Sequence, residues 1–237
     1  MQRYFSNKLV NDYFLLSDDD IYHIKTVMRL KENDKIEVVY KNIAYLCNLE
    51  NSDEKIQVKC LEEIQNVEQS IPEIILCIPL LKEQKMDFII QKATELGVSK
   101  IIPIRLERSI IKLDPSREEK KLARWNRICK EASEQSKRLS IPIVTSIMNI
   151  EDLESIDALK IVCSTSSTNF SLHNLLQTHF NCDRILIVVG PEGGLTKNEE
   201  KKLVDIGFEL VRLGNNIMRV ETVPVFLLSI INYEYME

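Results

Sequence analysis

The sequence predicts an α/β protein with a mainly parallel sheet, preceded by a small β-rich domain. Three observations lead to this prediction. Apolar strand-like runs alternate with helical patterns from residue 74 onward, which is typical of a parallel sheet. Short strand-like runs separated by polar turns fill residues 1–70, which favours a small barrel. Two apolar runs near the C-terminus end in glycine-containing turns. We therefore predict one domain over residues 1–70 and a second over residues 71–237.

The first domain is predicted to begin with a short helix, over residues 18–28. Asp18, Asp19 and Asp20 would lie at the positive end of its dipole. Three strands are then expected, with polar turns between them at Asn42 and at residues 51–53; they cover residues 35–40, 43–49 and 55–61. Residues 65–72 have the composition of a linker.

The second domain is predicted from alternating apolar runs and helical spacings. Apolar residues at helical intervals indicate a helix over residues 82–96, which Gly97 would end. Asp114 as N-cap and Pro115 at the first helical position begin a long helix that reaches about residue 138. A third helix, apolar on most sides, is expected over residues 221–233. The expected strands are residues 74–80, 100–104, 141–145, 159–162, 185–189 and 210–213.

The charge of the chain is unevenly distributed. The net charge of −5 argues against a protein held on nucleic acid by bulk charge, although a local basic face is compatible with it. Residues 100–138 contain twelve Lys or Arg and six Asp or Glu, so this stretch carries +6 and the rest of the chain −11. The basic stretch is either a polyanion-facing surface or a solvated helix with ion pairs such as Arg127 with Glu131.

The cysteines and histidines predict no metal site. None of the six cysteines forms a C-x-x-C motif, and the three histidines lack ligand spacing. Reduced thiols in a cytoplasmic protein are therefore expected. The first residues have no signal character. The longest apolar stretch, residues 223–231, is too short to span a bilayer, so no membrane association is expected.

Three turns at strand ends are candidates for a binding site. The strand at 185–189 runs into Gly190-Pro191-Glu192-Gly193-Gly194, and Thr196 with Glu199 then forms a capping box for a helix. This turn fits neither the P-loop nor the G-x-G-x-x-G pattern. The other two turns cover residues 163–166 and 213–218. Each alone reads as a tight turn, but in an open α/β sheet ligands bind where such turns gather, so together they predict a shared pocket.

Five segments in series resemble the ribosomal small-subunit RNA methyltransferase E family, and the resemblance covers nearly the whole chain. Three of them are Lys85-Met86-Asp87 through Gly97-Val98, Gly190 through Thr196, and Leu213-Gly214 followed by Ile217-Met218-Arg219-Val220-Glu221-Thr222. The remaining two are Glu131 through Arg138 with Pro142, and Arg3–Phe5 with residues 27–31. The chain departs from the family pattern at Asn215-Asn216 and at Val223-Pro224.

The resemblance implies both a fold and a function. The expected fold is a PUA-like β-barrel followed by an α/β methyltransferase domain of the SPOUT superfamily with a C-terminal trefoil knot. The expected protein is a homodimer that uses S-adenosylmethionine (SAM) to methylate N3 of a uridine in 16S rRNA, within the small ribosomal subunit. Two alternatives stay open: a SPOUT enzyme that methylates another RNA site, or a non-catalytic RNA-binding factor for ribosome assembly.

The resemblance and the turns together assign roles to residues. Arg219 is expected to favour the uridine anion, or else to bind turn carbonyls as a structural fork; Glu221 either takes the proton or orients Arg219. RNA contacts are expected from Arg3, Arg29, Lys31, Arg108 and Arg138. The residues expected to bind the cofactor are Cys163, Ser164, Thr165, Gly190, Pro191, Glu192, Gly193, Gly194, Leu213, Gly214, Ile217, Met218 and Thr222.

Overall fold

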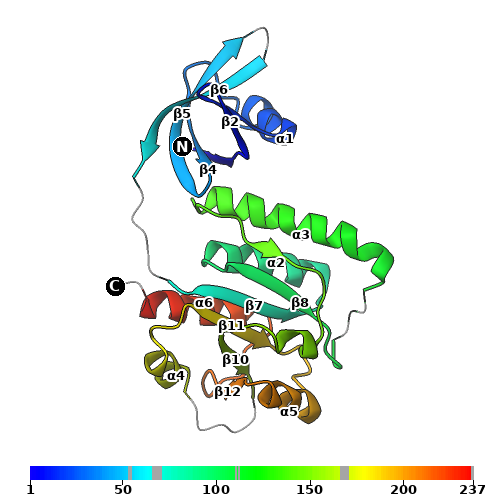
Figure 1. Cartoon of the computed structure of the whole chain (residues 1–237). Helices are drawn as coiled ribbons and strands as arrows, with labels where there is room; N and C mark the ends of the chain where they lie inside the picture. The colour runs from blue at the N-terminus through cyan, green and yellow to red at the C-terminus, as the bar shows by residue number, and fades with distance from the viewer. Residues whose placement is uncertain (53–54, 66–70, 110, 112, 166–170, 236–237) are drawn as a thin grey trace. The chain divides into compact units, whose positions relative to one another are not determined.

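The chain forms two compact units in a computed structural model, which describes residues 1–52, 55–65, 71–109, 111, 113–165 and 171–235. Unit 1 comprises Met1–Glu68 together with Ser133–Ser140, and unit 2 comprises Gln69–Ala132 with Ile141–Glu237. Residues 133–140 therefore group with the N-terminal residues, whereas a boundary drawn at residue 70 assigns them to the second domain. Figure 1 traces both units along the chain.

Unit 1 contains a six-stranded sheet in the order β1-β4-β5-β6-β3-β2. Strand β1 pairs with β4 in parallel, and every other neighbouring pair is antiparallel. The strands are β1 (Arg3–Phe5), β2 (Lys8–Val10), β3 (Tyr13–Leu15), β4 (Lys35–Tyr40), β5 (Ile43–Ser52) and β6 (Lys55–Ile64). The three predicted strands correspond to β4, β5 and β6. The three short N-terminal strands were not predicted, because three residues are too few to display a period of two.

The predicted helix of unit 1 begins where its acidic residues indicated. Helix α1 (Asp18–Tyr22) follows Ser17, whose Oγ accepts a hydrogen bond from the Asp20 N–H. The chain then continues as a π-helical turn, η1 (His23–Val27). The core of the unit is formed by buried side chains such as Tyr4, Phe14 and Ile36.

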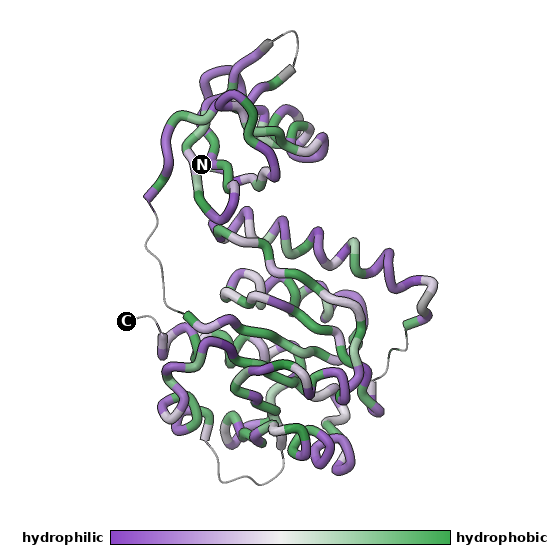
Figure 2. Tube along the Cα trace, in the orientation of Figure 1, coloured by the Kyte–Doolittle hydropathy of each residue, from purple (hydrophilic) through white to green (hydrophobic). Residues whose placement is uncertain are grey.

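Unit 2 is built on a parallel sheet in the order β12-β10-β11-β7-β8-β9. Its strands are β7 (Glu73–Pro79), β8 (Lys100–Ile104), β9 (Ile143–Val144), β10 (Leu159–Cys163), β11 (Arg184–Val189) and β12 (Glu209–Val211). Both faces are covered, so the central strands are apolar throughout rather than alternating (Figure 2). In β7, Ile74 and Leu76 enter one apolar layer, while Ile75 and Cys77 enter the other.

Helices cover the two faces of this sheet unequally. The first layer includes side chains of α2 (Glu83–Glu95), α3 (Pro115–Gln135), α4 (Leu172–Thr178) and α6 (Thr222–Glu234). The second includes side chains of the 3₁₀ helix η2 (Ile150–Leu153) and α5 (Lys197–Asp205).

None of the helices in the described part of the chain combines the length and apolar character needed to cross a bilayer.

The predicted helix ends are confirmed by their hydrogen bonds. Gly97 has φ +90°, and the chain reverses there as the Val98 N–H donates to the Ala93 carbonyl at 3.0 Å. At the start of α3, Oδ1 of Asp114 accepts from the Ser116 N–H at 3.0 Å. Helix α6 differs from its prediction as a buried helix, because Phe226 and Tyr233 are exposed.

The strand order positions the candidate site. Strand β10 lies between β11 and β12, and all three are parallel. Their carboxyl ends, at Cys163, Val189 and Val211, therefore lie at the same edge of the sheet. The three turns that the sequence singles out begin at these residues and meet there.

Candidate cofactor pocket and RNA-facing residues

The three turns enclose one cavity of about 720 Å³ in unit 2, a size typical of small-molecule sites. All the residues assigned to the cofactor except Thr222 line it, and so does Arg219. Thr222 is the first residue of α6, and its N–H donates to the Arg219 carbonyl at 2.9 Å. Glu221 precedes it and is also outside the cavity wall.

The glycine-rich turn leaves open space in this cavity. The Gly194 N–H donates to the Pro191 carbonyl at 2.8 Å, which closes a tight turn. Gly194 has φ +70°, a conformation that side chains other than glycine rarely adopt, and a Cβ built there meets no atom within 4 Å. A Cβ at Gly214, on the third turn, also meets none. Both glycines thus leave room that side chains would occupy.

The predicted capping box after this turn is confirmed. Thr196 Oγ1 accepts from the Glu199 N–H at 3.2 Å, and Glu199 Oε2 accepts from the Thr196 N–H at 2.8 Å. The other oxygen of this buried carboxylate accepts from the Glu107 N–H at 2.7 Å. One carboxylate therefore holds the start of α5 and the segment after β8 together.

Arg108 holds the glycine-rich turn from outside. Its Nη1 donates to the Gly193 carbonyl at 2.7 Å and lies 3.4 Å from the Leu195 carbonyl oxygen. The expectation for Arg108 was an RNA contact. Its observed hydrogen bonds instead point to a role in positioning the turn.

The turn after β10 brings a thiol and a hydroxyl to the cavity. Burial raises the pKa of the Cys163 thiol to about 12, so the thiol is neutral near pH 7 and is not a ready nucleophile. The Ser164 hydroxyl donates to the carboxylate of Glu200, on α5. Thr165 is exposed, while Ser166, the last residue of the predicted turn, lies outside the described residues.

The third turn carries the candidate catalytic cation. Arg212 Nε donates to the Gly214 carbonyl at 3.0 Å and holds the turn. Arg219 is exposed on the cavity wall, and among the described residues its guanidinium has no hydrogen-bond or ion-pair partner. Within the described residues, Arg219 thus lacks the bonds to turn carbonyls that a structural fork would make, and its role toward a ligand stays a prediction.

Glu221 is an ionised carboxylate beside this cation. Its own backbone N–H lowers its pKa, with further lowering by the Lys85 ammonium and by Arg219, despite partial burial. A carboxylate with a lowered pKa is a weak base. This argues against the first of its two expected roles, acceptance of the proton, while orientation of Arg219 stays a prediction.

Lys85, Glu200 and Arg212 also line the cavity, and sequence reasoning did not assign them to the site. Lys85 lies on α2, far from the turns in sequence. The signals available for it were its place at the start of a family segment and its charge on a helix with an apolar face. Neither identified it as part of the site.

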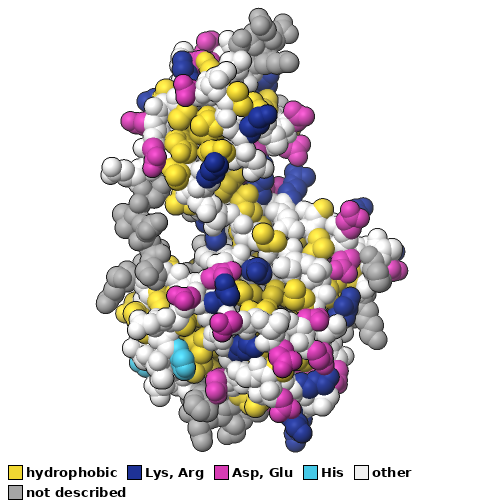
Figure 3. Space-filling view, in the orientation of Figure 1, with side chains coloured by type: hydrophobic (Ala, Val, Ile, Leu, Met, Phe, Trp, Pro, Cys, Tyr) yellow, Lys and Arg dark blue, Asp and Glu magenta, His cyan; other side chains and the backbone are white. Residues whose placement is uncertain are grey.

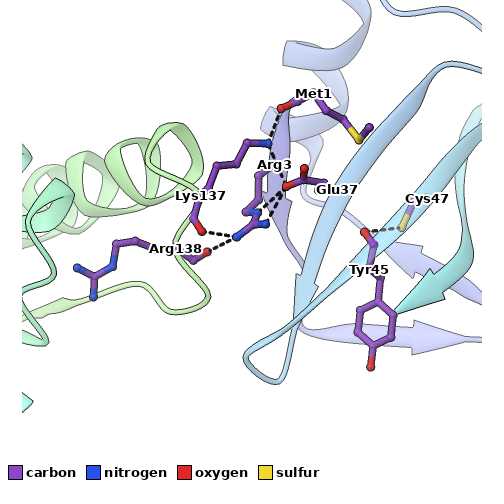
Figure 4. A network of polar contacts seen from close by, with 7 residues as sticks. All are labelled: Met1, Arg3, Glu37, Tyr45, Cys47, Lys137 and Arg138. Atoms are coloured by element: carbon purple, nitrogen blue, oxygen red, sulfur yellow. Dashed lines mark hydrogen bonds and ion pairs between the residues drawn. The ribbon is translucent and has the colours of Figure 1, made fainter. Parts of the chain in front are cut away.

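Arg3, expected to contact RNA, is an internal ion-pair partner in unit 1 (Figure 4). It is 6% exposed. Its guanidinium lies 2.8 Å from Glu37 Oε2 and donates to the main-chain carbonyls of Lys137 and Arg138. Lys137 binds the same carboxylate at 3.0 Å. This network explains why residues 133–140 group with the N-terminal strands, and it leaves little of Arg3 for a ligand.

The other cations expected to contact RNA in unit 1 are more accessible. Arg29 and Lys31 are exposed, and Arg29 has φ +54°, an uncommon conformation for a residue other than glycine. Arg138 is half-buried, and its Nε donates to the Ser140 carbonyl at 3.2 Å. On the face in Figure 3, basic and acidic side chains are interspersed, so this view displays local cations rather than one broad basic surface.

Ion pairs occupy part of the basic stretch at residues 100–138. The predicted pair of Arg127 with Glu131 is present at 2.9 Å, and Arg124 pairs with Asp87 at 2.6 Å.

Within the described residues, no group of three or more His, Cys, Asp or Glu side chains is arranged to hold a metal ion.

Comparisons with known proteins agree on one family. A profile described as an RNA methyltransferase domain matches residues 67–232, and one described as an RNA methyltransferase PUA domain matches residues 16–61. The ribosomal RNA small subunit methyltransferase E of Bacillus subtilis is 33% identical over 99% of this chain and 97% of its own length. That of Mesomycoplasma hyopneumoniae is 32% identical, over 97% of this chain and 98% of its own length.

A solved structure has the same architecture. It is a ribosomal RNA small subunit methyltransferase E from Neisseria gonorrhoeae bound to SAM. It is 29% identical to this chain, covers 99% of this chain and 98% of its own, and superposes with a TM-score of 0.87.

Proposed function

Because this chain belongs to the ribosomal RNA small subunit methyltransferase E family, we propose that it methylates N3 of a uridine in 16S rRNA with SAM as methyl donor. The observation that carries the proposal is the cavity at the carboxyl ends of β10, β11 and β12. The Neisseria relative carries SAM, and its fold matches this chain over nearly the whole length.

The cavity fits SAM in size and in chemistry. The open positions beside Gly194 and Gly214 leave space against the backbone, and apolar walls such as Val189 and Leu213 suit an adenine ring. The carboxylates of Glu192 and Glu200 on the wall match a ligand with a sulfonium and an ammonium group. When bound, SAM supplies an electrophilic methyl group.

Residues around the cavity are proposed to activate the uridine. N3 is a poor nucleophile until its proton passes to solvent water, and a cation near the uracil oxygens favours the resulting anion. Arg219 is the proposed cation, and Glu221 is proposed to orient it rather than to accept the proton. The neutral Cys163 thiol argues against covalent catalysis by that residue. The target base must be unpaired or extruded, because pairing hides N3.

RNA recognition is proposed to rest on local cations and on shape. Arg29, Lys31 and Arg138 are the proposed contacts in unit 1, whereas Arg3 and Arg108 are assigned to positioning. Residues 1–70 hold nine Lys or Arg against thirteen Asp or Glu, so this part is not a general polyanion binder. A large, shaped target such as the assembled small subunit is therefore favoured over a short oligonucleotide.

Family membership also supports finer proposals. We expect the C-terminal part of unit 2 to be knotted, the first unit to close as a PUA-like barrel and the protein to act as a homodimer in the cytoplasm. Phe226 and Tyr233 on α6 are 37% and 79% exposed, and Ile217 is 82% exposed. Apolar side chains left uncovered in one copy favour an interface with a second.

Methyl mapping in a deletion strain tests the proposal. 16S rRNA and small subunits from cells that lack the protein are incubated with the purified enzyme and labelled SAM, and the product is mapped by mass spectrometry. We expect one N3-methyluridine, restored by the wild type and absent with Arg219→Ala. A methyl group on another site would indicate a related enzyme of different specificity, and absence of SAM binding would favour an assembly factor.

A further inference from the structure

One lysine joins three segments around the cavity. Nζ of Lys85, on α2, lies 2.5 Å from Oε1 of Glu192 on the glycine-rich turn and 3.1 Å from Oε2 of Glu221 before α6. The three side chains are 30%, 40% and 21% exposed, respectively. Oε2 of Glu221 is buried and has no hydrogen-bond partner among the described residues, so its contact with Lys85 is an ion pair. The contact with Glu192 spans 107 positions of sequence.

The arrangement contains more negative than positive charge. Two carboxylates share one ammonium, so loss of the lysine would leave two like charges close together without their shared counter-ion. The contacts with Glu192 and then with Glu221 raise the pKa of Lys85, which is therefore charged at neutral pH. Partly exposed ion pairs add little to folding stability, so the effect of Lys85 is expected to be local to the cavity.

We infer that Lys85 is a positioning residue of the site: it holds the carboxylates of Glu192 and Glu221, and with them the glycine-rich turn and the start of α6. The effect of Lys85 on catalysis rests on the proposed function, because Glu221 is there assigned to orient Arg219. The effect of Lys85 on the glycine-rich turn does not depend on the RNA target. These two consequences can be measured separately.

The first measurement needs neither RNA nor SAM. Hydrogen exchange of a peptide that covers residues 190–195 is compared in the ligand-free wild type, Lys85→Met and Lys85→Arg. We expect faster exchange in Lys85→Met and near wild-type exchange in Lys85→Arg, which keeps the charge. Lys92→Met is the matched control, because Lys92 lies on the same helix and pairs with Glu95 at 2.8 Å, away from the turn. It should leave this peptide unchanged.

The second measurement is a double-mutant cycle on SAM affinity by calorimetry. Lys85→Met is expected to weaken binding about tenfold, as charge-assisted contacts of this kind do. Glu192→Gln in the same chain removes the repulsion, so Lys85→Met/Glu192→Gln should bind SAM within about threefold of Glu192→Gln alone. If Lys85→Met weakens binding by the same factor in the Glu192→Gln background as in the wild type, the lysine acts independently of Glu192, and the positioning role is overturned.

The third measurement is the pH profile of methyl transfer at saturating SAM. In the wild type the pKa of Glu221 is lowered, by its own N–H first and then by Lys85 and Arg219. Without the lysine, and with Glu192 nearby, it should rise, so the acid limb of the profile should move to higher pH. Lys85→Arg should keep the wild-type limb.

Unchanged exchange, affinity and acid limb in Lys85→Met would make the contacts an ordinary surface ion-pair network and end the proposal. If the wild type binds SAM but leaves 16S rRNA unmethylated, the proposed function fails while the first two measurements still decide the role of Lys85. If the wild type binds no SAM, the exchange measurement decides it alone.

Discussion

The guanidinium of Arg108 donates to the main-chain carbonyl of Gly193 at 2.7 Å, and its stem occupies the space next to that glycine. A Cβ at residue 193 would lie 3.3 Å from Cδ of Arg108 and 3.4 Å from its Cβ. Glycine at this position therefore allows an arginine from the segment after β8 to lie against the turn. A cation expected to face RNA thus contacts the main chain of the glycine-rich turn.

Arg108→Ala should weaken SAM binding more than RNA binding. Loss of hydrogen bonds from an exposed guanidinium predicts a rise of about three- to tenfold in the Kd for SAM, measured by calorimetry. Arg105→Ala is the control, because Arg105 lies in the same segment after β8 but pairs with Glu118 instead. A drop in RNA affinity with unchanged SAM affinity would return Arg108 to the RNA-binding residues.

Gly194→Val should abolish SAM binding while the protein stays folded. The side chain would extend into open space of the cavity, and the positive φ adds strain of about 1–2 kcal/mol. Gly207→Val has comparable strain at φ +93° but lies outside the cavity wall. The thermal unfolding temperature should therefore be lowered similarly in both variants. Only Gly194→Val should lose SAM binding in calorimetry. Full affinity in a folded Gly194→Val would refute the location of the pocket.

Arg219→Ala should retain SAM binding and lose at least about a hundredfold in methyl transfer, because the missing cation acts on the uracil anion. Single-turnover rates at saturating SAM measure this. Arg212→Ala should change SAM affinity and leave the single-turnover rate at saturating SAM near the wild-type value. The reason is that Arg212 holds the Gly214 carbonyl. A near wild-type rate for Arg219→Ala would make that residue structural.

Phe226→Asp should convert the expected homodimer into monomers, because it places a charge among the exposed apolar side chains of α6. Light scattering at micromolar concentration reports the mass. Phe88→Asp is the matched control, since Phe88 is 43% exposed but lies on α2. A wild-type protein with the mass of a single chain would contradict the homodimer.

The double variant Arg29→Ala/Arg138→Ala should lose activity on the assembled small subunit with little change in SAM affinity. Removal of each cation that binds a phosphate should reduce the log–log salt dependence of RNA binding by about 0.7–0.9. Lys8→Ala, another exposed cation of unit 1, serves as the control. Equal wild-type activity on the subunit and on a short uridine-containing RNA would argue against recognition of a large, shaped target.

The sequence by itself determined the local parts of this protein. Helix starts at Asp114 and Thr196 and the stop at Gly97 were predictable, because capping depends on residues within one turn. Buried parallel strands such as β7 and β11 were predictable from apolar runs. The three turns were identifiable as candidates because each directly follows such a run.

Only the tertiary structure decided which residues share the site. Strand β10 lies between β11 and β12, and this order brings the three turns together. Periodicity cannot reveal the strand order, because a periodic pattern reports which residues are buried and not which strand is adjacent. The same limit applies to Lys85, which contacts Glu192 across 107 positions, and to Arg3, which contacts carbonyls of residues 137 and 138. A charged residue has the same appearance in sequence whether its partner is RNA or a distant main-chain carbonyl, and only the folded chain selects between them.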